Sequence, residues 1–180
     1  KMVKSISERM GEKDREINHN VIASYLHDLG KRTASHLTLL SIAMRAEYRK
    51  RAQRYHLTPS RLFDSVHLPP QVNHVLTHLY ENFDGSGLPE KLSGDRIPLG
   101  ARIIAVVEAF EDLTHNAENH LGKTFPPDEA LARLEEHAGR LFDPDVVETL
   151  AGIVRGEAAV VTAAGNLVLD ADVSAGFSRI

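Results

Sequence analysis

Residues 14–31 have the sequence DREINHNVIASYLHDLGK, which predicts a helix that ends in a histidine–aspartate pair. Apolar side chains recur at helical spacing along this stretch, and Gly30 is typical of a helix end. His27 and Asp28 offer a neutral nitrogen and an anionic oxygen ligand from one turn of chain, and such a carboxylate can bridge two metal ions. Lys31 follows one turn later and is suited to an anionic phosphate. The alternative interpretation is an ordinary helix C-terminus with a favourable cation and a capping glycine.

Outside this stretch, the chain is predicted to be mostly helical, with one long loop in the middle. The loop covers residues 81–99, and the glycines and prolines clustered at its tip are typical of a turn. A strongly apolar segment follows the loop and predicts a buried helix. The predicted helices span residues 1–10, 14–29, 37–55, 58–66, 71–80, 100–113, 128–138 and 144–154.

The end of the chain differs in character from the rest. Residues 158–163 and 167–171 are rich in Val, Leu and Ala around Gly165-Asn166, which predicts a β-hairpin. We therefore expect an all-α helical bundle with a small C-terminal β-hairpin appendage. The helical domain would cover residues 1–155. Residues 156–180 would form the hairpin tail or the start of a further segment.

Composition narrows the classes of function. The chain has 180 residues, of which 42% are hydrophobic and 26% charged, and its net charge is −4. Cysteine is absent, which excludes disulfides, thiolate zinc sites and cysteine nucleophiles. No apolar run approaches the roughly 18 residues that a membrane span needs, and no Lys/Arg block dominates the chain. We expect a cytoplasmic domain without a membrane or nucleic-acid partner.

Further motifs follow the histidine–aspartate pair in a defined order. They are HDLGK at 27–31, His56, His78, ENFDGSGLP at 81–89, IPLGARI at 97–103 and LFDPDVV at 141–147. In that order and at those spacings, the chain resembles the HD-GYP family, a bacterial branch of the HD-domain phosphohydrolases. The resemblance extends from about residue 10 to residue 154, with GLP in place of the family's GYP.

The resemblance implies a fold, a reaction and cofactors. The family is an all-helical HD-domain bundle with a binuclear or trinuclear metal centre, and its members hydrolyse cyclic di-GMP through a metal-bridged hydroxide. Nitrogen and oxygen ligands without thiolate suit iron or manganese. Family members are often attached to a sensor domain, so the expected partners are cyclic di-GMP or a related nucleotide and a sensor or GGDEF-type domain.

The resemblance also assigns roles to single residues. The implied metal ligands are His27, Asp28, His56, His78 and Glu108, where Glu108 takes the place of an aspartate. The implied catalytic residues are Asp28, as the bridging ligand, and Lys31, beside the phosphate. The implied substrate-binding residues are Lys31, Asp84, Gly85, Gly87, Leu88, Pro89, Arg102 and Lys123. Arg102 is equally well explained by a structural ion pair, and Asp84 with its glycines by an ordinary turn.

The chain departs from the family pattern at several of these places. Leu79 and Tyr80 stand where two adjacent histidines are usual, so that His78 could replace only one ligand, and only if its helix shifts. Leu88 replaces the motif tyrosine, and Glu118 lies where the family has a basic phosphate clamp, for which Lys123 is a partial substitute. A further histidine ligand of the family would fall before residue 1, so the domain is expected to be N-terminally incomplete.

These departures leave three hypotheses open. The first is a metal-dependent phosphodiesterase acting on cyclic di-GMP. The second is a degenerate HD-GYP module that binds a nucleotide or a protein partner in signalling without hydrolysis. The third is an HD-type phosphohydrolase of another nucleotide or phosphoester. Metal occupancy and turnover separate the first hypothesis from the second, and substrate preference separates it from the third.

Overall fold

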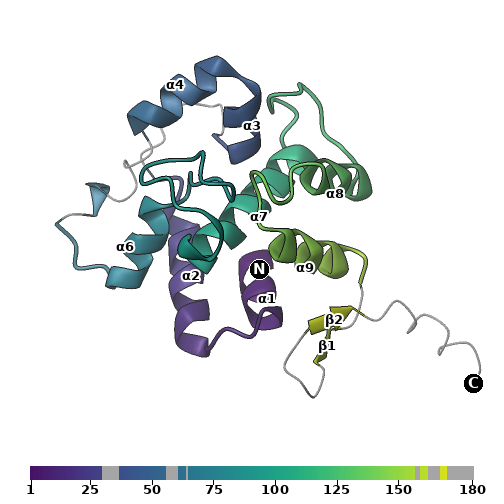
Figure 1. The fold of residues 1–180 in the computed structure, drawn as a ribbon, viewed down its shortest axis with the longest axis horizontal. Coiled ribbons are helices and arrows are strands. Elements are labelled where there is room, and N and C mark those ends of the chain that lie inside the picture. Colours follow the sequence, from purple (N-terminus) through teal and green to yellow (C-terminus); the bar gives the residue numbers. More distant parts are fainter. Residues whose placement is uncertain (30–36, 56–60, 64, 157–158, 162–166, 170–180) are drawn as a thin grey trace, which may run out of the picture.

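One buried helix, α7 (Leu99–His115), organises the fold of this computed structural model, which describes residues 1–29, 37–55, 61–63, 65–156, 159–161 and 167–169. Its side chains are apolar on most of the circumference, which is typical of a helix enclosed by others. It runs through the middle of the molecule in Figure 1, with α2 (Asp14–Leu26) and α6 (Pro70–Thr77) on one side. On the other side lie α8 (Pro127–Glu135) and α9 (Pro144–Val154).

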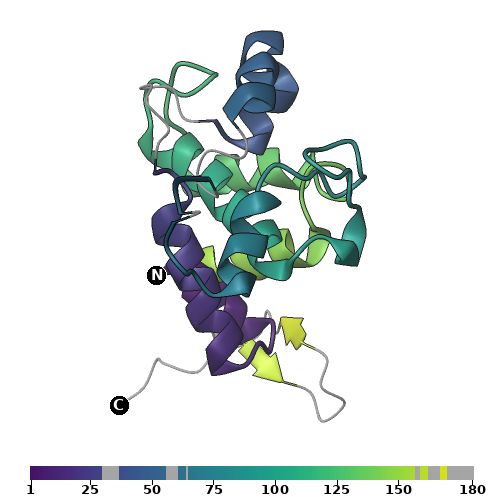
Figure 2. The same ribbon diagram turned by 90° about the vertical axis from the view of Figure 1, so that its left-hand side faces the viewer.

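Among the described helices, those that pack most extensively against α7 are α1 (Met2–Arg9), α2, α3 (Leu39–Met44), α6, α8 and α9. Their apolar faces form one continuous core that includes the fully buried Ile6, Val72, Ile103, Leu131 and Leu150. α3 and α4 (Ala46–Tyr55) lie at the opposite end of the molecule from α1 and α2 in both views (Figures 1 and 2). The predicted all-α bundle is confirmed.

The helical stretch predicted at 37–55 is divided into two helices in the structure. Thr38 and Ser41 form a reciprocal capping box that starts α3. The chain then becomes extended at Arg45, with φ −132° and ψ 124°. The Arg45 guanidinium donates a hydrogen bond to the carbonyl of His120, in the loop after α7. This long-range contact lies at the break between α3 and α4. No glycine or proline in the sequence predicts that break.

The other helices begin and end within a few residues of the predicted bounds. The helix predicted at 71–80 ends at Thr77, which matters for His78 below. The long loop at 81–99 is confirmed and contains only the short 3-10 turn η1 (Gly94–Arg96). The helix predicted at 58–66 lies partly outside the described residues.

Two short strands lie in the segment where a hairpin is predicted, and residues 162–166 between them lie outside the described residues. β1 (Ala159–Val161) pairs antiparallel with β2 (Leu167–Leu169), and Val160 lies opposite Val168. The division into domains at residue 155 stays a prediction. Within the described ranges, no helix has the length and apolar character that crossing a membrane requires.

Candidate metal centre

Helix α2 carries His27 and Asp28 at its C-terminal end. Its inner face buries Ile17, Asn20 and Ala23 in the bundle, and this fixes the direction in which its last turn points. The His27 amide still bonds to the Ala23 carbonyl at 2.9 Å, so the histidine continues the helical turn. A helix C-terminus carries partial negative charge, which favours a cation at this position.

Glu108 comes from the middle of α7 and meets the end of α2. Its carboxylate lies 3.6 Å from His27 Nε2, and the Asp28 carboxylate lies 3.2 Å from the same nitrogen. One ligand atom from each of these three residues lies within 4.8 Å of the other two. We call His27, Asp28 and Glu108 the metal cluster. In the sequence, Glu108 lies 80 residues after Asp28.

The His27 ring is oriented by a second contact. Its Nδ1 lies 2.6 Å from the Ser24 carbonyl oxygen, so this nitrogen must donate the proton. The neutral ring then has its lone pair on Nε2, the atom that faces both carboxylates. A metal-binding histidine usually donates its other ring N–H to a carbonyl or carboxylate in this way. Ser24 therefore prepares His27 as a ligand through its backbone, a role that the sequence motif alone did not reveal.

The residues of the metal cluster differ in their access to solvent. The Glu108 side chain is 4% exposed and that of Asp28 is 44% exposed. Both border a hollow of about 370 Å³ between α1, α2 and α7, which Glu111 and Lys1 also line. A buried carboxylate is costly unless a positive charge accompanies it. Glu108 thus forms the inner wall of the cluster, and Asp28 lies at its mouth.

The donor set fits a divalent cation. One imidazole nitrogen and two carboxylate oxygens suit iron, manganese or zinc, and they provide no soft ligand. The three groups are all electron-pair donors with ligand atoms within 4.8 Å of one another, and a cation between them would offset their mutual repulsion. The predicted ligands His27, Asp28 and Glu108 are thus brought together. Lys31 and His56 lie outside the described residues, and their roles stay predictions.

His78 lies apart from the metal cluster. α6 ends just before it, and its side chain is only 3% exposed. Its Nδ1 lies 2.8 Å from the His74 carbonyl oxygen, and its Nε2 lies 3.7 Å from a carboxylate oxygen of Glu90. Burial is the main cause that lowers the pKa of His74, and the nearby His78 ring lowers it further. His78 is not part of the group formed by His27, Asp28 and Glu108, and its ligand role stays a prediction.

The signature loop, Asp84–Pro89, is built by short local contacts. The Asp84 carboxylate accepts hydrogen bonds from the backbone N–H of Ser86 at 2.8 Å and from its hydroxyl at 2.6 Å. Gly85 has a φ of +84°, and a Cβ on Gly87 would lie 2.1 Å from the backbone nitrogen of Asn82. These residue types are therefore required by the turn itself.

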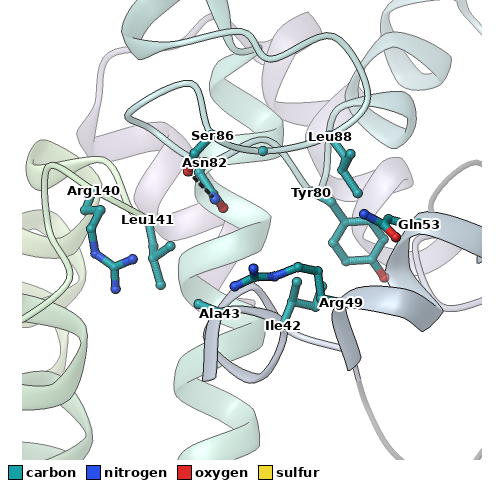
Figure 3. Close-up of a pocket in the computed structure, with 11 residues that line it drawn as sticks. Ile42, Ala43, Arg49, Gln53, Tyr80, Asn82, Ser86, Leu88, Arg140 and Leu141 are labelled. Atoms are coloured by element: carbon teal, nitrogen blue, oxygen red, sulfur yellow. Dashed lines mark hydrogen bonds between the residues drawn. The ribbon is translucent and has the colours of Figure 1, made fainter. Parts of the chain in front are cut away.

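The signature loop borders a pocket that is different from the hollow beside the metal cluster. Gly87 and Leu88 line this pocket together with residues of α3, of α4 and of the loop after α8 (Figure 3). None of the residues that line it also lines the hollow at the metal cluster. A substrate role for Asp84, Gly85, Gly87, Leu88 and Pro89 stays a prediction.

Two further predicted substrate residues have structural contacts. Arg102 Nη1 lies 2.5 Å from Asp143 Oδ2 and 3.0 Å from Asp95 Oδ1, so that it joins α7 to the start of α9. This is the ion pair that was the alternative to phosphate contact. The Lys123 ammonium lies 4.9 Å from the centre of the Phe125 ring, and Lys123 lines neither of the two pockets described above.

The family follows from a comparison with known proteins. A family described as "HD domain" matches residues 1–146, which include the whole metal cluster. The chain belongs to the HD-domain family. HD-domain phosphohydrolases are metal-dependent, in agreement with the ligand set above.

Curated relatives extend this HD-domain assignment. The chain is 33% identical over 156 residues to the cyclic di-GMP phosphodiesterase response regulator RpfG of Xanthomonas campestris, covering 85% of this chain and 40% of the relative. It is 29% identical to a cyclic di-GMP phosphodiesterase of Thermotoga maritima, covering 79% and 39%. It is 32% identical to the 3'3'-cGAMP-specific phosphodiesterase 3 of Vibrio cholerae, covering 71% and 28%. The resemblance to the HD-GYP type is confirmed.

Solved structures agree on the HD-domain fold. A cyclic GMP-AMP-specific phosphodiesterase of Vibrio cholerae superposes with a TM-score of 0.66 at 21% identity, covering 86% of this chain and 42% of that one. The HD-GYP-type protein Bd1817 of Bdellovibrio bacteriovorus gives a TM-score of 0.67 at 18% identity, covering 86% and 51%. The chain spans about two fifths of the length of the first curated relatives.

Proposed function

We propose that this domain is a metal-dependent phosphodiesterase that hydrolyses cyclic di-GMP. The observation that supports it most strongly is that ligand atoms of His27, Asp28 and Glu108 lie within 4.8 Å of one another beside an open hollow. Five curated relatives are named as phosphodiesterases of cyclic di-GMP or cGAMP, and a sixth is named as a probable cyclic di-GMP phosphodiesterase. We further propose two divalent ions, or three, with iron or manganese as the native metal.

In this proposal, different residues of the chain take part in different steps of the hydrolysis. Water must add to phosphorus and lose a proton, and the leaving sugar oxygen must gain one. A divalent ion held by His27, Asp28 and Glu108 would polarise the phosphoryl oxygens and make a bound water more acidic. Asp28, the most exposed member, can accept a hydrogen bond from the attacking water and orient it. Lys31 is proposed to stabilise the phosphate or protonate the leaving group.

The surroundings of the metal cluster support its ability to hold this arrangement. Glu108 is fixed in the central helix, and His27 is oriented by the Ser24 carbonyl. Neither residue needs to reorganise when a substrate arrives, and such pre-organised charge is the main source of electrostatic catalysis. The open side at Asp28 leaves room for a phosphodiester to approach.

A second substrate is favoured by a specific observation. Relatives that are 32% and 36% identical are named 3'3'-cGAMP-specific phosphodiesterases. cGAMP and cyclic di-GMP share the phosphodiester ring and differ in one base, so the metal cluster would treat both alike. Discrimination between them must come from residues that contact the bases.

The test is turnover of both cyclic dinucleotides by protein loaded anaerobically with iron or manganese. Asp28→Asn should lower kcat by at least about 100-fold, since it removes a charged ligand and the group that orients the water. The matched control is Asp14→Asn, the same change in the exposed first turn of α2, which should retain activity. Absence of turnover at full metal occupancy would reject the enzymatic proposal and favour the binding-module hypothesis.

A further inference from the structure

The pocket beside the signature loop contains two arginines from distant parts of the chain. Arg49 comes from α4 and Arg140 from the loop between α8 and α9, and both line a cavity of about 220 Å³. In Figure 3, the two guanidinium groups project toward the space between them, with Asn82 and Leu141 on its border. We call this cavity the arginine pocket.

Neither guanidinium is neutralised by a carboxylate of the described residues. Arg140 Nη2 lies 3.1 Å from His137 Nδ1, a neutral acceptor. Burial and then the Arg140 charge lower the pKa of His137, so this ring stays uncharged at neutral pH. Arg49 has no acidic partner within 4.0 Å in the part of the chain that the structure describes. The pocket therefore carries two positive charges that an anionic ligand can compensate.

The charge of α4 reinforces this positive character. The helix has four basic residues, Arg49, Lys50, Arg51 and Arg54, against the single acid Glu47. The whole chain, by contrast, has a net charge of −4. A local excess of positive charge on an acidic protein attracts anions to that face and raises their rate of encounter. The sequence signal, Arg49-Lys50-Arg51, is short and is not related to any family motif.

The rest of the lining suits a flat group attached to the anion. Ile42, Leu88 and Leu141 supply apolar surface, and Asn82 and Gln53 supply amides. The Asn82 amide donates to the Ser86 hydroxyl at 2.9 Å, which holds it at the rim. The cavity volume is several times the share of one water molecule in the liquid, about 30 Å³. It therefore has room for a phosphate and part of an adjoining ring system.

We propose that the arginine pocket binds the phosphate monoester of a mononucleotide, at a site separate from the metal cluster. Arginine is the side chain best suited to bidentate contact with a terminal phosphate, which carries nearly two negative charges at pH 7. The choice of mononucleotide rests on the proposed function. Addition of one water to each phosphodiester of a cyclic dinucleotide releases two mononucleotides, and each carries such a phosphate.

The proposal is tested by calorimetric titration of 5′-GMP into the intact chain. Arg49→Ala and Arg140→Ala should each raise Kd at least tenfold, because each removes one of the two charges. Arg49→Lys should weaken binding less than Arg49→Ala, since it keeps the charge and loses the bidentate geometry. Lys50→Ala is the matched control on the same helix, lies outside the pocket lining, and should change Kd less than twofold.

Two further titrations distinguish this site from the metal cluster. Guanosine, which lacks the phosphate, should not bind measurably. Asp28→Asn should bind 5′-GMP as the wild type does, even though it has lost hydrolysis. The proposal is overturned if 5′-GMP does not bind, if both arginine variants bind it normally, or if Asp28→Asn abolishes binding. Normal 5′-GMP binding at the arginines in a protein without turnover would uphold this site and reject the proposed enzymatic function.

Discussion

Glu108 and Asp28 carry the same charged group in very different surroundings. Glu108 is 4% exposed on the central helix, and Asp28 is 44% exposed at the end of α2. The longer side chain of glutamate, where the family has aspartate, still brings its carboxylate to 3.6 Å from His27. The substitution therefore keeps a carboxylate beside His27. It supports the interpretation of Glu108 as an inner ligand and Asp28 as the group nearest to substrate.

Gly87 shows how strictly a single residue is specified in the signature loop. A Cβ at this position would lie 2.1 Å from the Asn82 nitrogen and 2.5 Å from the Glu81 Cα, and both are backbone atoms that cannot turn away. We predict that Gly87→Ala lowers the free energy of unfolding by about 3 kcal/mol, the upper end for overpacking. Chemical denaturation measures the loss.

The control for Gly87 is Gly94, which lies later in the same long loop. Gly94 has a φ of +57°, but a Cβ at this position would meet no other atom within 4 Å. Gly94→Ala should therefore cost only about 1–2 kcal/mol of backbone strain. Equal losses for the two variants would show that the close approach at Gly87 does not constrain the loop.

Among the elements, the packing of α2 on α7 decides whether the metal cluster forms. Gly100 of α7 lies against Asn20 of α2, and a Cβ there would come within 2.0 Å of the Asn20 side-chain oxygen. Asn20 cannot move aside cheaply, because its amide donates to Ser7 and to Glu12, the latter at 2.6 Å. The glycine therefore sets how closely the two ligand-bearing helices approach.

We predict that Gly100→Ala lowers the free energy of unfolding by about 2 kcal/mol and weakens metal binding. In an Asn20→Ala background, where the obstructing side chain is gone, the same change should cost about 1 kcal/mol or less. A double-mutant cycle by urea denaturation measures this coupling. Additive effects of the two substitutions would contradict the proposed contact.

The sequence predicted the elements better than it predicted their contacts. His27, Asp28 and Glu108 could be proposed because family motifs mark them, although they are far apart in the chain. The break at Arg45 could not, since its partner is the carbonyl of His120, 75 residues later. The arginine pocket was missed for the same reason, because Arg49 and Arg140 share a site only after folding. Long-range contacts of this kind leave no trace in local periodicity.

At the scale of the whole molecule, His74, His120 and His137 make the free energy of unfolding depend on pH in the same direction. Burial is the main cause that lowers the pKa of His74, His120 and His137, and neighbouring positive charges add to it at the last two. The unfolded chain protonates them near their ordinary pKa of about 6.5. Their contribution to stability is therefore complete above about pH 6.5, and it is lost as the pH falls through the lowered pKa values.

We predict a fall in the free energy of unfolding between pH 7.5 and 5.5, measured by urea denaturation. Burial raises the pKa of Glu12, which acts in the opposite direction, so a single-residue comparison is needed. His120 is the suitable residue, since neither ring nitrogen forms a hydrogen bond within the described ranges. His120→Gln should make the decrease in the free energy of unfolding over this pH range smaller than in the wild type. An unchanged pH profile in this variant would show that His120 does not contribute.

The central claim is that His27, Asp28 and Glu108 hold a divalent metal ion. It is tested most directly by titrating Mn²⁺ into metal-free protein and following the bound ion by electron paramagnetic resonance. The wild type should bind at least one ion per chain. Asp28→Asn and Glu108→Gln should each weaken binding by about 10- to 100-fold or more, and Asp14→Asn should bind as the wild type does. Unchanged Mn²⁺ affinity in both ligand variants would contradict the account.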